Sequence, residues 1–484
     1  VSGRTEVSGR TGTDSVQQRA EPSSGTPRDS GTVRTGRSTT VSEQRELDPA
    51  TAETSDKPVL DTDFDLQSED IGKGGLRQKY NDNITTIKIL KLLESENRIA
   101  TPEERKQIAK YVGWGALKGV FDKDNKQWTK EYQELKDLLT DAEYKAARAS
   151  VLNAHFTSKE VVNGIVSIVD RLGFKSGRVL EPSVGTGNFF GLMPASLRKK
   201  SELHGVELDP ITSQIVAALY PSAKIAKATG FQDFQIPAEY FDLVIGNPPF
   251  GNEPIVDNDR SPYSGFSIHN YFFAKSIDKL RPGGILAMVV SRNFMDARTN
   301  NTRKWIAERA DLVAAVRLPN TAFKENAGTE VVTDIIVLRK RGKDEAKNNT
   351  QWVETGLQDL TNNKTGETAS INVNQYFIDN PQHILGEPTA GGSMYRANEY
   401  TVESINYPLD ALLRNWVSSN IPENIYQPIS RTDVITSANY SVPDGVKVGS
   451  FFINDQGDVL QRGEDELGSK TAQSWLSPNN KAME

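Results

Sequence analysis

The chain has 484 residues, of which 36% are hydrophobic and 25% are charged, and it carries a net charge of -7 at pH 7. This length allows roughly two or three domains, and the modest negative charge excludes binding to nucleic acid by bulk electrostatic attraction, so a nucleic-acid surface would have to be a local basic patch. The chain has no cysteine, which excludes disulfides, thiolate metal sites and catalysis through a covalent cysteine nucleophile.

The sequence indicates neither a metal site nor a membrane-spanning or secreted protein. The four histidines, His155, His204, His269 and His383, lack the spacing of metal ligands, so no catalytic metal is predicted. No apolar run is long enough to span a membrane and no signal peptide is found, which predicts a soluble protein.

The N-terminal part of the chain divides in two by composition. Residues 1–75 are rich in Ser, Thr, Gly and Arg, their first aromatic residue is Phe64, and they are predicted to be a disordered arm. Residues 76–150 are predicted to form a helical domain, in which Thr101 to Glu104 fits a capping box. Trp114 lies between two glycines and is either a packing anchor or part of a substrate channel, and the usual burial of large aromatics favours packing.

Residues 151–345 alternate between strand and helix patterns, which predicts a mostly parallel sheet with helices on both faces. The strands are expected near residues 178, 203, 223, 241, 284, 312 and 333. Ahead of them, Ser158 fits the cap of a helix from Lys159 to Leu172.

A glycine turn follows the first of these strands. Gly185 and Gly187 permit unusual backbone dihedrals and a close approach to a nucleotide cofactor, either S-adenosylmethionine or a dinucleotide. Phe190 replaces the third glycine of the dinucleotide fingerprint, which weighs against a nicotinamide cofactor. Glu181, at the strand end, could face the ammonium of a methionine moiety, a group that nicotinamide cofactors lack.

Acidic residues follow the next two strands. Glu207 lies roughly twenty residues beyond the glycines, the offset used to bind ribose hydroxyls. Asp209 is predicted to cap the helix that Pro210 opens. Asp233 and Phe234 could offer an acid to the edge of an adenine and a ring to its face, although this signal is weak alone.

The tetrapeptide Asn247-Pro248-Pro249-Phe250 ends the buried strand 241–246, because consecutive prolines cannot continue a sheet ladder. Asn247 is therefore held at the carboxyl edge of the sheet, where open α/β sheets bind ligands. Its side-chain oxygen and the Pro248 carbonyl can both accept hydrogen bonds from one exocyclic NH2, and Phe250 can stack on a base. An ordinary Asn-Pro turn is the alternative interpretation.

The rest of the chain carries weaker signals. The polar loop Gly251 to Ser267 would overhang the tetrapeptide, either to close over a base or as a plain insertion. Residues 346–484 are predicted to be a linker with a small C-terminal region for target recognition or docking, containing a helix at Tyr407–Val417 and short strands at 440–465. A local basic patch is conceivable at Arg292, Arg298, Arg303, Lys304, Arg317 and Lys324, although an ordinary solvated charged surface is the favoured interpretation for most of them.

Together, the order and spacing of these motifs over residues 150–342 resemble the amino-methyltransferases that methylate the N6 of adenine in DNA. The resemblance implies a Rossmann-like class I fold with a seven-stranded sheet, S-adenosylmethionine as cofactor, and DNA with a flipped adenine as substrate. It implies that the catalytic residues are Asn247, Pro248, Pro249 and Phe250 and that Phe250 stacks on the base. Phe323 is a second candidate for stacking, and a buried core phenylalanine is equally expected there. The resemblance also implies cofactor binding by Phe156, Thr157, Glu181, Pro182, Gly185, Gly187, Asn188, Glu207, Asp233, Phe234 and Asn247.

A narrower resemblance, carried by residues 111–117, 153–157 and 371–386, is to the methylase part of large phage and plasmid methyltransferase-helicase polypeptides, which include antirestriction proteins. It implies a role in phage antirestriction or DNA modification in the cytoplasm of a bacterial host, with virion association as a further expectation. The implied helicase would be a partner, because this chain has no phosphate-loop motif. The alternatives are methylation of RNA or of protein glutamine, a non-catalytic DNA-binding module and, lowest, a nicotinamide oxidoreductase.

Overall fold

The computed structural model describes only part of the chain. It describes residues 63–69, 74–153, 157–258, 261–323, 331–348, 350–392 and 398–428, and the backbone of strands 451–453, 459–464 and 470–474. Most of the predicted N-terminal arm therefore lies outside the described residues. Within these residues, no helix is long and apolar enough to cross a membrane.

One segment of the predicted arm packs on the core, which corrects the prediction of disorder for it. In residues 63–69, Leu66 is only 2% exposed, and its amide donates a hydrogen bond to the carbonyl of Gly191 (3.0 Å). The amide of Phe64 donates to the carbonyl of Leu219 (2.9 Å). The reason is that this segment combines an apolar side chain with two backbone amides that satisfy carbonyls at helix ends.

The central sheet has the predicted seven strands. They are β1 (Arg178–Glu181), β2 (Glu202–Glu207), β3 (Lys224–Lys227), β4 (Phe241–Gly246), β5 (Leu280–Ser291), β6 (Ala310–Arg317) and β7 (Thr333–Lys340). Their order is β3-β2-β1-β4-β5-β7-β6, and β7 alone runs antiparallel to its neighbours. The central strands are buried on both faces, so they read in the sequence as continuous apolar runs.

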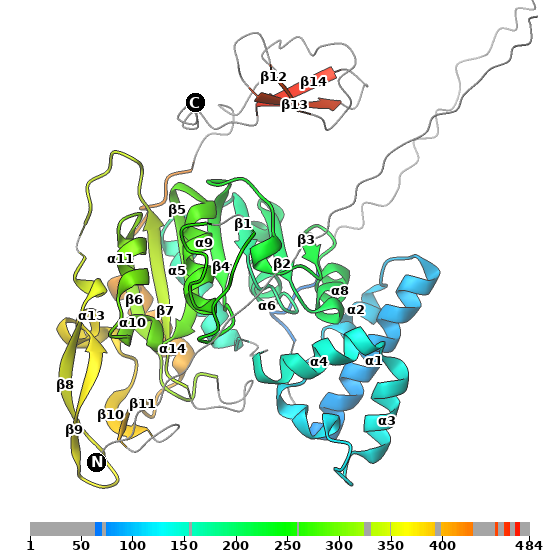
Figure 1. Ribbon diagram of the computed structural model, residues 1–484, viewed down its shortest axis with the longest axis horizontal. Coiled ribbons are helices and arrows are strands. Elements are labelled where there is room, and N and C mark those ends of the chain that lie inside the picture. The colour runs from blue at the N-terminus through cyan, green and yellow to red at the C-terminus, as the bar shows by residue number, and fades with distance from the viewer. Residues whose placement is uncertain are drawn as a thin grey trace, which may run out of the picture. The chain divides into compact units, whose positions relative to one another are not determined.

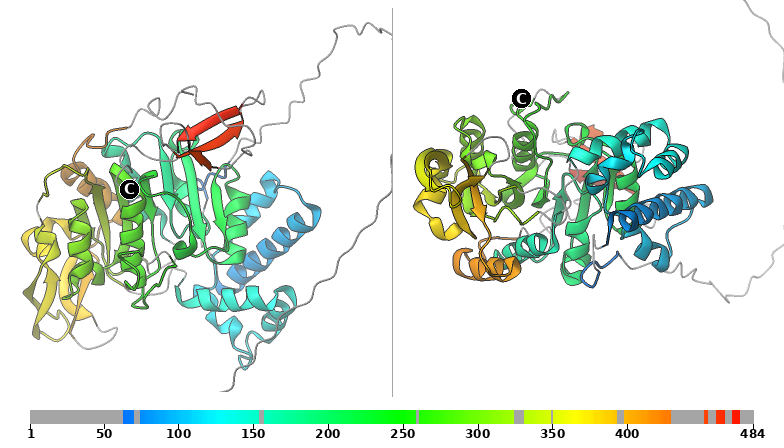
Figure 2. Two further views of the ribbon diagram at one scale, coloured as in Figure 1. Left: turned by 45° about the horizontal axis from the view of Figure 1, so that its top comes forward. Right: turned by 90° about the horizontal axis from the view of Figure 1, so that it is seen from below.

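Helices cover both faces of the sheet (Figures 1 and 2). Alternate residues of β5 belong to two separate hydrophobic clusters, Ile285 to one and Leu286 to the other, as the period of a strand requires. The first cluster includes α5 (Lys159–Arg171) and α8 (Pro210–Leu219), and the second includes α9 (Ile268–Lys279) and α11 (Asn301–Ala307). Shorter helices complete this part of the chain: α6 (Asn188–Leu192), α7 (Ala195–Lys199) and α10 (Asn293–Asp296). This is the Rossmann-like class I methyltransferase arrangement expected from the sequence.

The helical domain packs at the β3 side of the sheet, against α8 (Figure 1). It contains α1 (Leu76–Glu96), α2 (Pro102–Ile108), η1 (Gly115–Phe121), α3 (Thr129–Leu138) and α4 (Asp141–Asn153). The predicted capping box at Thr101 is confirmed, with reciprocal hydrogen bonds to Glu104. Trp114 is 1% exposed and packs edge-on against Phe121, with ring centroids 5.4 Å apart, which confirms its interpretation as a packing anchor.

Residues 350–428 do not form the linker expected from composition. Their apolar side chains, although scattered in the sequence, are members of one or the other of the two hydrophobic clusters of the core. The elements are β8 (Thr355–Thr361), β9 (Thr368–Asn374), α13 (Gln375–Asp379), β10 (Glu387–Gly392), β11 (Glu399–Glu403) and α14 (Leu409–Asn420). Trp352 and Phe377 are buried in one cluster and Trp416 in the other. Farther on, β12 (Phe451–Ile453), β13 (Val459–Glu464) and β14 (Lys470–Ser474) pair as an antiparallel sheet, which extends the predicted short strands beyond residue 465.

Candidate active site

A cavity of about 410 Å³ opens at the carboxyl edge of the parallel strands. The ends of three adjacent strands contribute to it, through Glu181 as the last residue of β1, Glu207 as the last residue of β2 and Asn247 directly after β4. The topology therefore gathers in one cavity three residues that the sequence separates widely.

The glycine turn after β1 depends on its glycines. Gly187 caps α6 with φ of +81°, and a Cβ at this position would lie 2.4 Å from the Tyr220 ring, so no side chain fits without displacing that ring. Gly185 has φ of +55°, and its amide donates to Oε2 of Glu207 (2.9 Å). The turn is thereby fixed to the acid at the end of the neighbouring strand.

Glu207 is held by backbone amides on both carboxyl oxygens. In addition to the bond from Gly185, Oε1 accepts from the amide of Asp209 (2.8 Å), and lone pairs on both oxygens remain for ribose hydroxyls. Burial raises the pKa of Glu207 to about 7, although the amide donors oppose that rise. Asp209 caps α8 by accepting from the amide of Thr212 (2.8 Å), as predicted.

Glu181 is a buried acid with an unsatisfied oxygen. It is 2% exposed, and its Oε2 accepts no hydrogen bond from the described residues. Burial, together with the charge of Glu207, raises the pKa of Glu181 well above its ordinary value. An ammonium placed against Oε2 would supply the missing donor and offset the buried charge, so the pair of acids fits the methionine and ribose moieties of S-adenosylmethionine.

The tetrapeptide that ends β4 lies in the same cavity. Asn247, Pro248, Pro249 and Phe250 all line it, and Phe250 packs half-buried against the core. The Ser183 hydroxyl, from the glycine turn, donates to the backbone carbonyl of Asn247 (3.1 Å). The cofactor turn and the tetrapeptide are therefore joined directly.

Several other predicted site residues can be placed. Thr157, Pro182 and Asn188 line the cavity. Phe156 lies outside the described residues. Asp233 is exposed and does not line the cavity; its carboxylate accepts from the Gln232 side chain (2.9 Å).

Two predicted aromatic contacts are not at the cavity. Phe234 packs beside Phe231, with ring centroids 6.3 Å apart, and it is Phe231 that lines the cavity, because the short helix η2 (Phe231–Asp233) turns that ring inward. Phe323 is 1% exposed in the hydrophobic core and does not line the cavity.

Sequence reasoning missed several lining residues. Leu208 is 66% exposed although it is apolar, and it lines the cavity beside Glu207. The sequence could have indicated Leu208, because it directly follows Glu207, the acid expected to bind the ribose. An exposed leucine at this position offers an apolar surface to a base. Ala146, Ala149 and Ser150 of α4 also line the cavity, and no motif marks them.

The loop Gly251 to Ser267 reaches the cavity. It pairs with itself through the amide of Ile255 and the carbonyl of Phe266 (2.9 Å), and Ile255 lines the cavity. Residues 259–260 lie outside the described residues.

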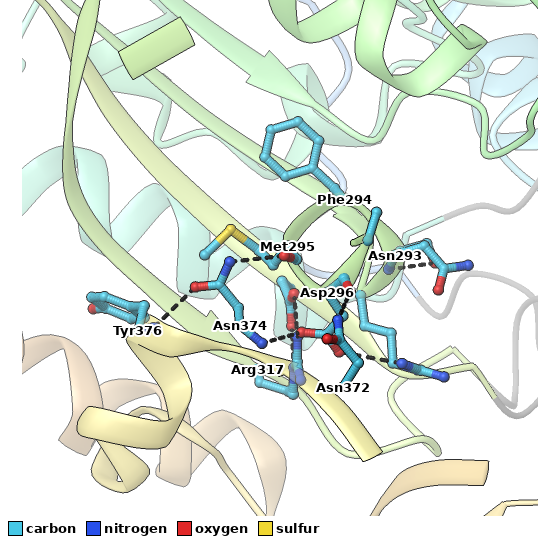
Figure 3. Close-up of polar contacts among 12 residues, drawn as sticks. Asn293, Phe294, Met295, Asp296, Arg317, Asn372, Asn374 and Tyr376 are labelled. Atoms are coloured by element: carbon cyan, nitrogen blue, oxygen red, sulfur yellow. Dashed lines mark hydrogen bonds and ion pairs between the residues drawn. The ribbon is translucent and has the colours of Figure 1, made fainter. Parts of the chain in front are cut away.

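The conceivable basic patch is wrong for two of its members. Arg303 (1% exposed) donates to the carbonyls of Val353, Phe294 and Ala297. Arg317 (0% exposed) is ion-paired with Asp296 (Figure 3) and with Asp334. Their guanidinium groups bond to acceptors inside the protein, because a buried arginine needs internal acceptors, so they do not contribute to a basic surface. Arg298 and Lys304 are exposed, Arg292 is paired with Asp296, and Lys324 lies outside the described residues. Among the described residues, no group of three or more His, Asp or Glu could hold a metal ion.

Comparisons with known proteins agree with this geometry. A sequence profile of the Eco57I restriction-modification methylase family matches residues 97–323. The chain is similar to "Defense against restriction protein B" of Escherichia phage P1, with 28% identity over 193 residues that cover 39% of this chain and 8% of that protein. It is also similar to the Type II methyltransferase M.CvrRI of Paramecium bursaria Chlorella virus XZ-6E, with 29% identity covering 38% of this chain and 48% of that protein.

Among solved structures, the chain resembles a putative class I S-adenosylmethionine-dependent methyltransferase from Listeria monocytogenes, with a TM-score of 0.35, 16% identity, and coverage of 56% of this chain and 91% of that one. The chain spans less than half of the length of both curated relatives, at 8% and 48%. The profile match covers the helices from α2 onward and the sheet through β6. Residues 97–323 thus form an Eco57I-type restriction-modification methylase domain, whose fold is that of the class I methyltransferases and whose cofactor is S-adenosylmethionine.

Proposed function

We propose that this domain transfers a methyl group to the exocyclic N6 amino group of adenine in DNA. The observation that carries the proposal is the position of Asn247-Pro248-Pro249-Phe250 at the end of β4, in the same cavity as Glu181 and Glu207. When bound, S-adenosylmethionine supplies an electrophilic methyl group on its sulfonium. The task of the protein is then to present an amino nitrogen to that methyl group in line.

The residues of the tetrapeptide suit that task. The side-chain oxygen of Asn247 and the carbonyl of Pro248 would accept the two amino hydrogens, which directs the nitrogen lone pair toward the methyl group. Phe250 would stack on the base. No covalent enzyme nucleophile is needed, in keeping with a chain that has no cysteine.

DNA is the acceptor that the relatives support. The matching profile is that of a restriction-modification methylase, and one relative is named for defence against restriction. A paired adenine cannot reach the cavity, so the base must be flipped out at a cost of roughly a few kcal/mol, which stacking on Phe250 and the hydrogen bonds to Asn247 would offset. A role in phage antirestriction or DNA modification, with a helicase as partner, follows as part of the proposal.

The parts of the chain take roles accordingly. Residues 76–150 would be the helical domain, and residues 151–345 would be the methyltransferase domain. The strands at 451–474 would belong to a target-recognition or docking region. Single- or double-strand preference and the recognition sequence would be set outside the motifs.

The test is mass spectrometry of nucleosides from unmethylated DNA that has been incubated with the chain and S-adenosylmethionine. N6-methyldeoxyadenosine is expected with the unaltered protein. Asn247→Ala should abolish the product and largely retain cofactor binding, because it removes the orienting acceptor and leaves Glu181 and Glu207 in the cavity. Asn252→Ala is the matched control, since Asn252 is exposed, lies five positions on and does not line the cavity.

Unchanged turnover in Asn247→Ala would overturn the mechanism. Methylated RNA or methylated glutamine in place of methylated DNA, in parallel incubations with those acceptors, would overturn the substrate and leave the cofactor assignment intact.

A further inference from the structure

One helix of the N-terminal domain lies at the cavity. Ala146, Ala149 and Ser150 of α4 line the same cavity as Glu181 and Glu207. These positions are spaced i, i+3 and i+4, so they share one face of the helix. Two of the three side chains end at Cβ, which leaves the space in front of this face to the cavity.

The helical domain is fixed to the cofactor end of the core by specific contacts. Tyr111 is 4% exposed, and its hydroxyl lies near the Thr212 side chain at the start of α8, which acts to lower the pKa of Tyr111 against the larger rise caused by burial. The amide of Thr212 donates to Asp209 (2.8 Å), and the amide of Asp209 donates to Glu207 (2.8 Å). A continuous series of polar contacts therefore runs from the helical domain to the acid expected to bind ribose, and α4 also packs on α8.

The cavity beside α4 holds an independent sign of a ligand. Glu181 is 2% exposed, lines this cavity, and leaves its Oε2 without a hydrogen bond from the described residues. A buried carboxyl oxygen without a donor is costly unless a ligand supplies one. The space between this group and α4 is therefore built for a molecule with a cationic or hydrogen-bond-donating group.

We propose that α4 forms a wall of the S-adenosylmethionine pocket and that the small side chains of Ala146 and Ala149 determine whether the cofactor fits. The proposal rests on the cofactor assignment and is independent of the methyl acceptor. The helical domain is then part of the cofactor site, and cofactor affinity depends on both domains. Ala146 and Ala149 take no part in the chemistry of methyl transfer, because they act only by leaving space for the cofactor.

The test compares two alanine-to-tryptophan variants of the full chain. Ala149→Trp places a large side chain at the cavity, whereas Ala142→Trp makes the same change at another exposed alanine, two turns earlier on the same face of α4 and outside the cavity. Binding of S-adenosylmethionine and of S-adenosylhomocysteine is measured by titration calorimetry. Thermal unfolding followed by circular dichroism shows that each variant is folded.

Ala149→Trp should weaken binding of both compounds by about tenfold or more, which corresponds to about 1.4 kcal/mol, and Ala142→Trp should bind like the unaltered chain. The melting temperatures without ligand should agree, since both alanines are exposed. If folded Ala149→Trp binds S-adenosylmethionine as tightly as Ala142→Trp does, the proposal that α4 forms a wall of the cofactor pocket is refuted. Absence of binding by the unaltered chain would refute both the wall and the cofactor assignment, whereas binding without DNA methylation would refute only the proposed substrate.

Discussion

Replacing Arg317 by methionine should destabilise the fold strongly. Arg317 ends β6, is 0% exposed, and donates from Nε to Asp334 Oδ1 (2.8 Å) and from Nη2 to Asp334 Oδ2 (2.9 Å). Its Nη2 also donates to Asp296 (2.9 Å), and Figure 3 shows this centre between α10 and the neighbouring Asn372 and Asn374. The variant keeps the apolar length of the side chain and removes the charge.

The size of the loss in unfolding free energy follows from the buried carboxylate that loses its partner. Removing one partner of a buried ion pair costs about 3–5 kcal/mol, because the other charge is left uncompensated. In this case the uncompensated carboxylate is that of Asp334, which is 0% exposed, whereas Asp296 (5% exposed) keeps its ion pair with Arg292. Arg339→Met is the control, since the more exposed pair of Arg339 with Glu345 should be worth only about 0–1 kcal/mol.

The loss should also depend on pH. In the unaltered protein burial raises the pKa of Asp334 and Arg317 lowers it, so without Arg317 that pKa rises further. A carboxyl whose pKa is higher in the folded than in the unfolded state takes up a proton on folding, so the deficit is largest above the folded pKa and shrinks as the pH falls through it. Urea unfolding followed by circular dichroism at pH 7 and pH 5 measures both effects. A loss below about 1 kcal/mol at pH 7, relative to Arg339→Met, would refute this account of a buried charge network.

Three further predictions concern the cofactor site and the segment that precedes the helical domain. Gly187→Ala should lower the melting temperature and weaken S-adenosylmethionine binding, because the new Cβ would lie 2.4 Å from Tyr220. The backbone at φ of +81° adds a cost of about 1–2 kcal/mol for any residue other than glycine. An unchanged melting temperature and an unchanged affinity would contradict this prediction. Binding of S-adenosylmethionine near pH 6.5 should release protons, because the pKa of Glu207 is raised to about 7 and that of Glu181 well above its ordinary value, and both carboxylates are favoured by the ammonium and hydroxyl donors of the ligand. Calorimetry in buffers of different ionisation enthalpy measures this release, and identical heats in all buffers would exclude it. Leu66→Ala should cost about 2–5 kcal/mol of unfolding free energy in urea titrations, and a chain as stable as the unaltered one would show that residues 63–69 do not belong to the core.

The sheet could be predicted from the sequence because its strands are buried on both faces. Runs such as Phe241–Gly246 are uninterrupted by polar residues other than Asp242, and glycine or proline marks their ends. The residues at the carboxyl ends of these strands were therefore predictable as neighbours, and Glu181, Glu207 and Asn247 do share one cavity.

The parts that could not be predicted depend on contacts between distant segments. Trp352 lies in irregular sequence and Trp416 in the helix predicted at Tyr407–Val417, which α14 confirms, but only the path of residues 350–428 across the core explains why both are buried. An arginine in a sequence looks the same whether it is exposed or, like Arg303, buried and bonded to three backbone carbonyls. Ala149 has no functional group by which it could be recognised, since its contribution is the space that it leaves.

The position of β7 has a consequence for synthesis of the chain. β7 lies between β5 and β6 in the sheet but follows both in the sequence, and in the described sheet β6 pairs with β7 alone. While the chain emerges from the ribosome, β6 therefore has no hydrogen-bonded neighbour and β5 keeps one edge open until residue 340 is available. Open edges of apolar strands pair readily with other chains. The interval between the emergence of residues 317 and 340 is thus the period of translation in which this domain is most exposed to aggregation.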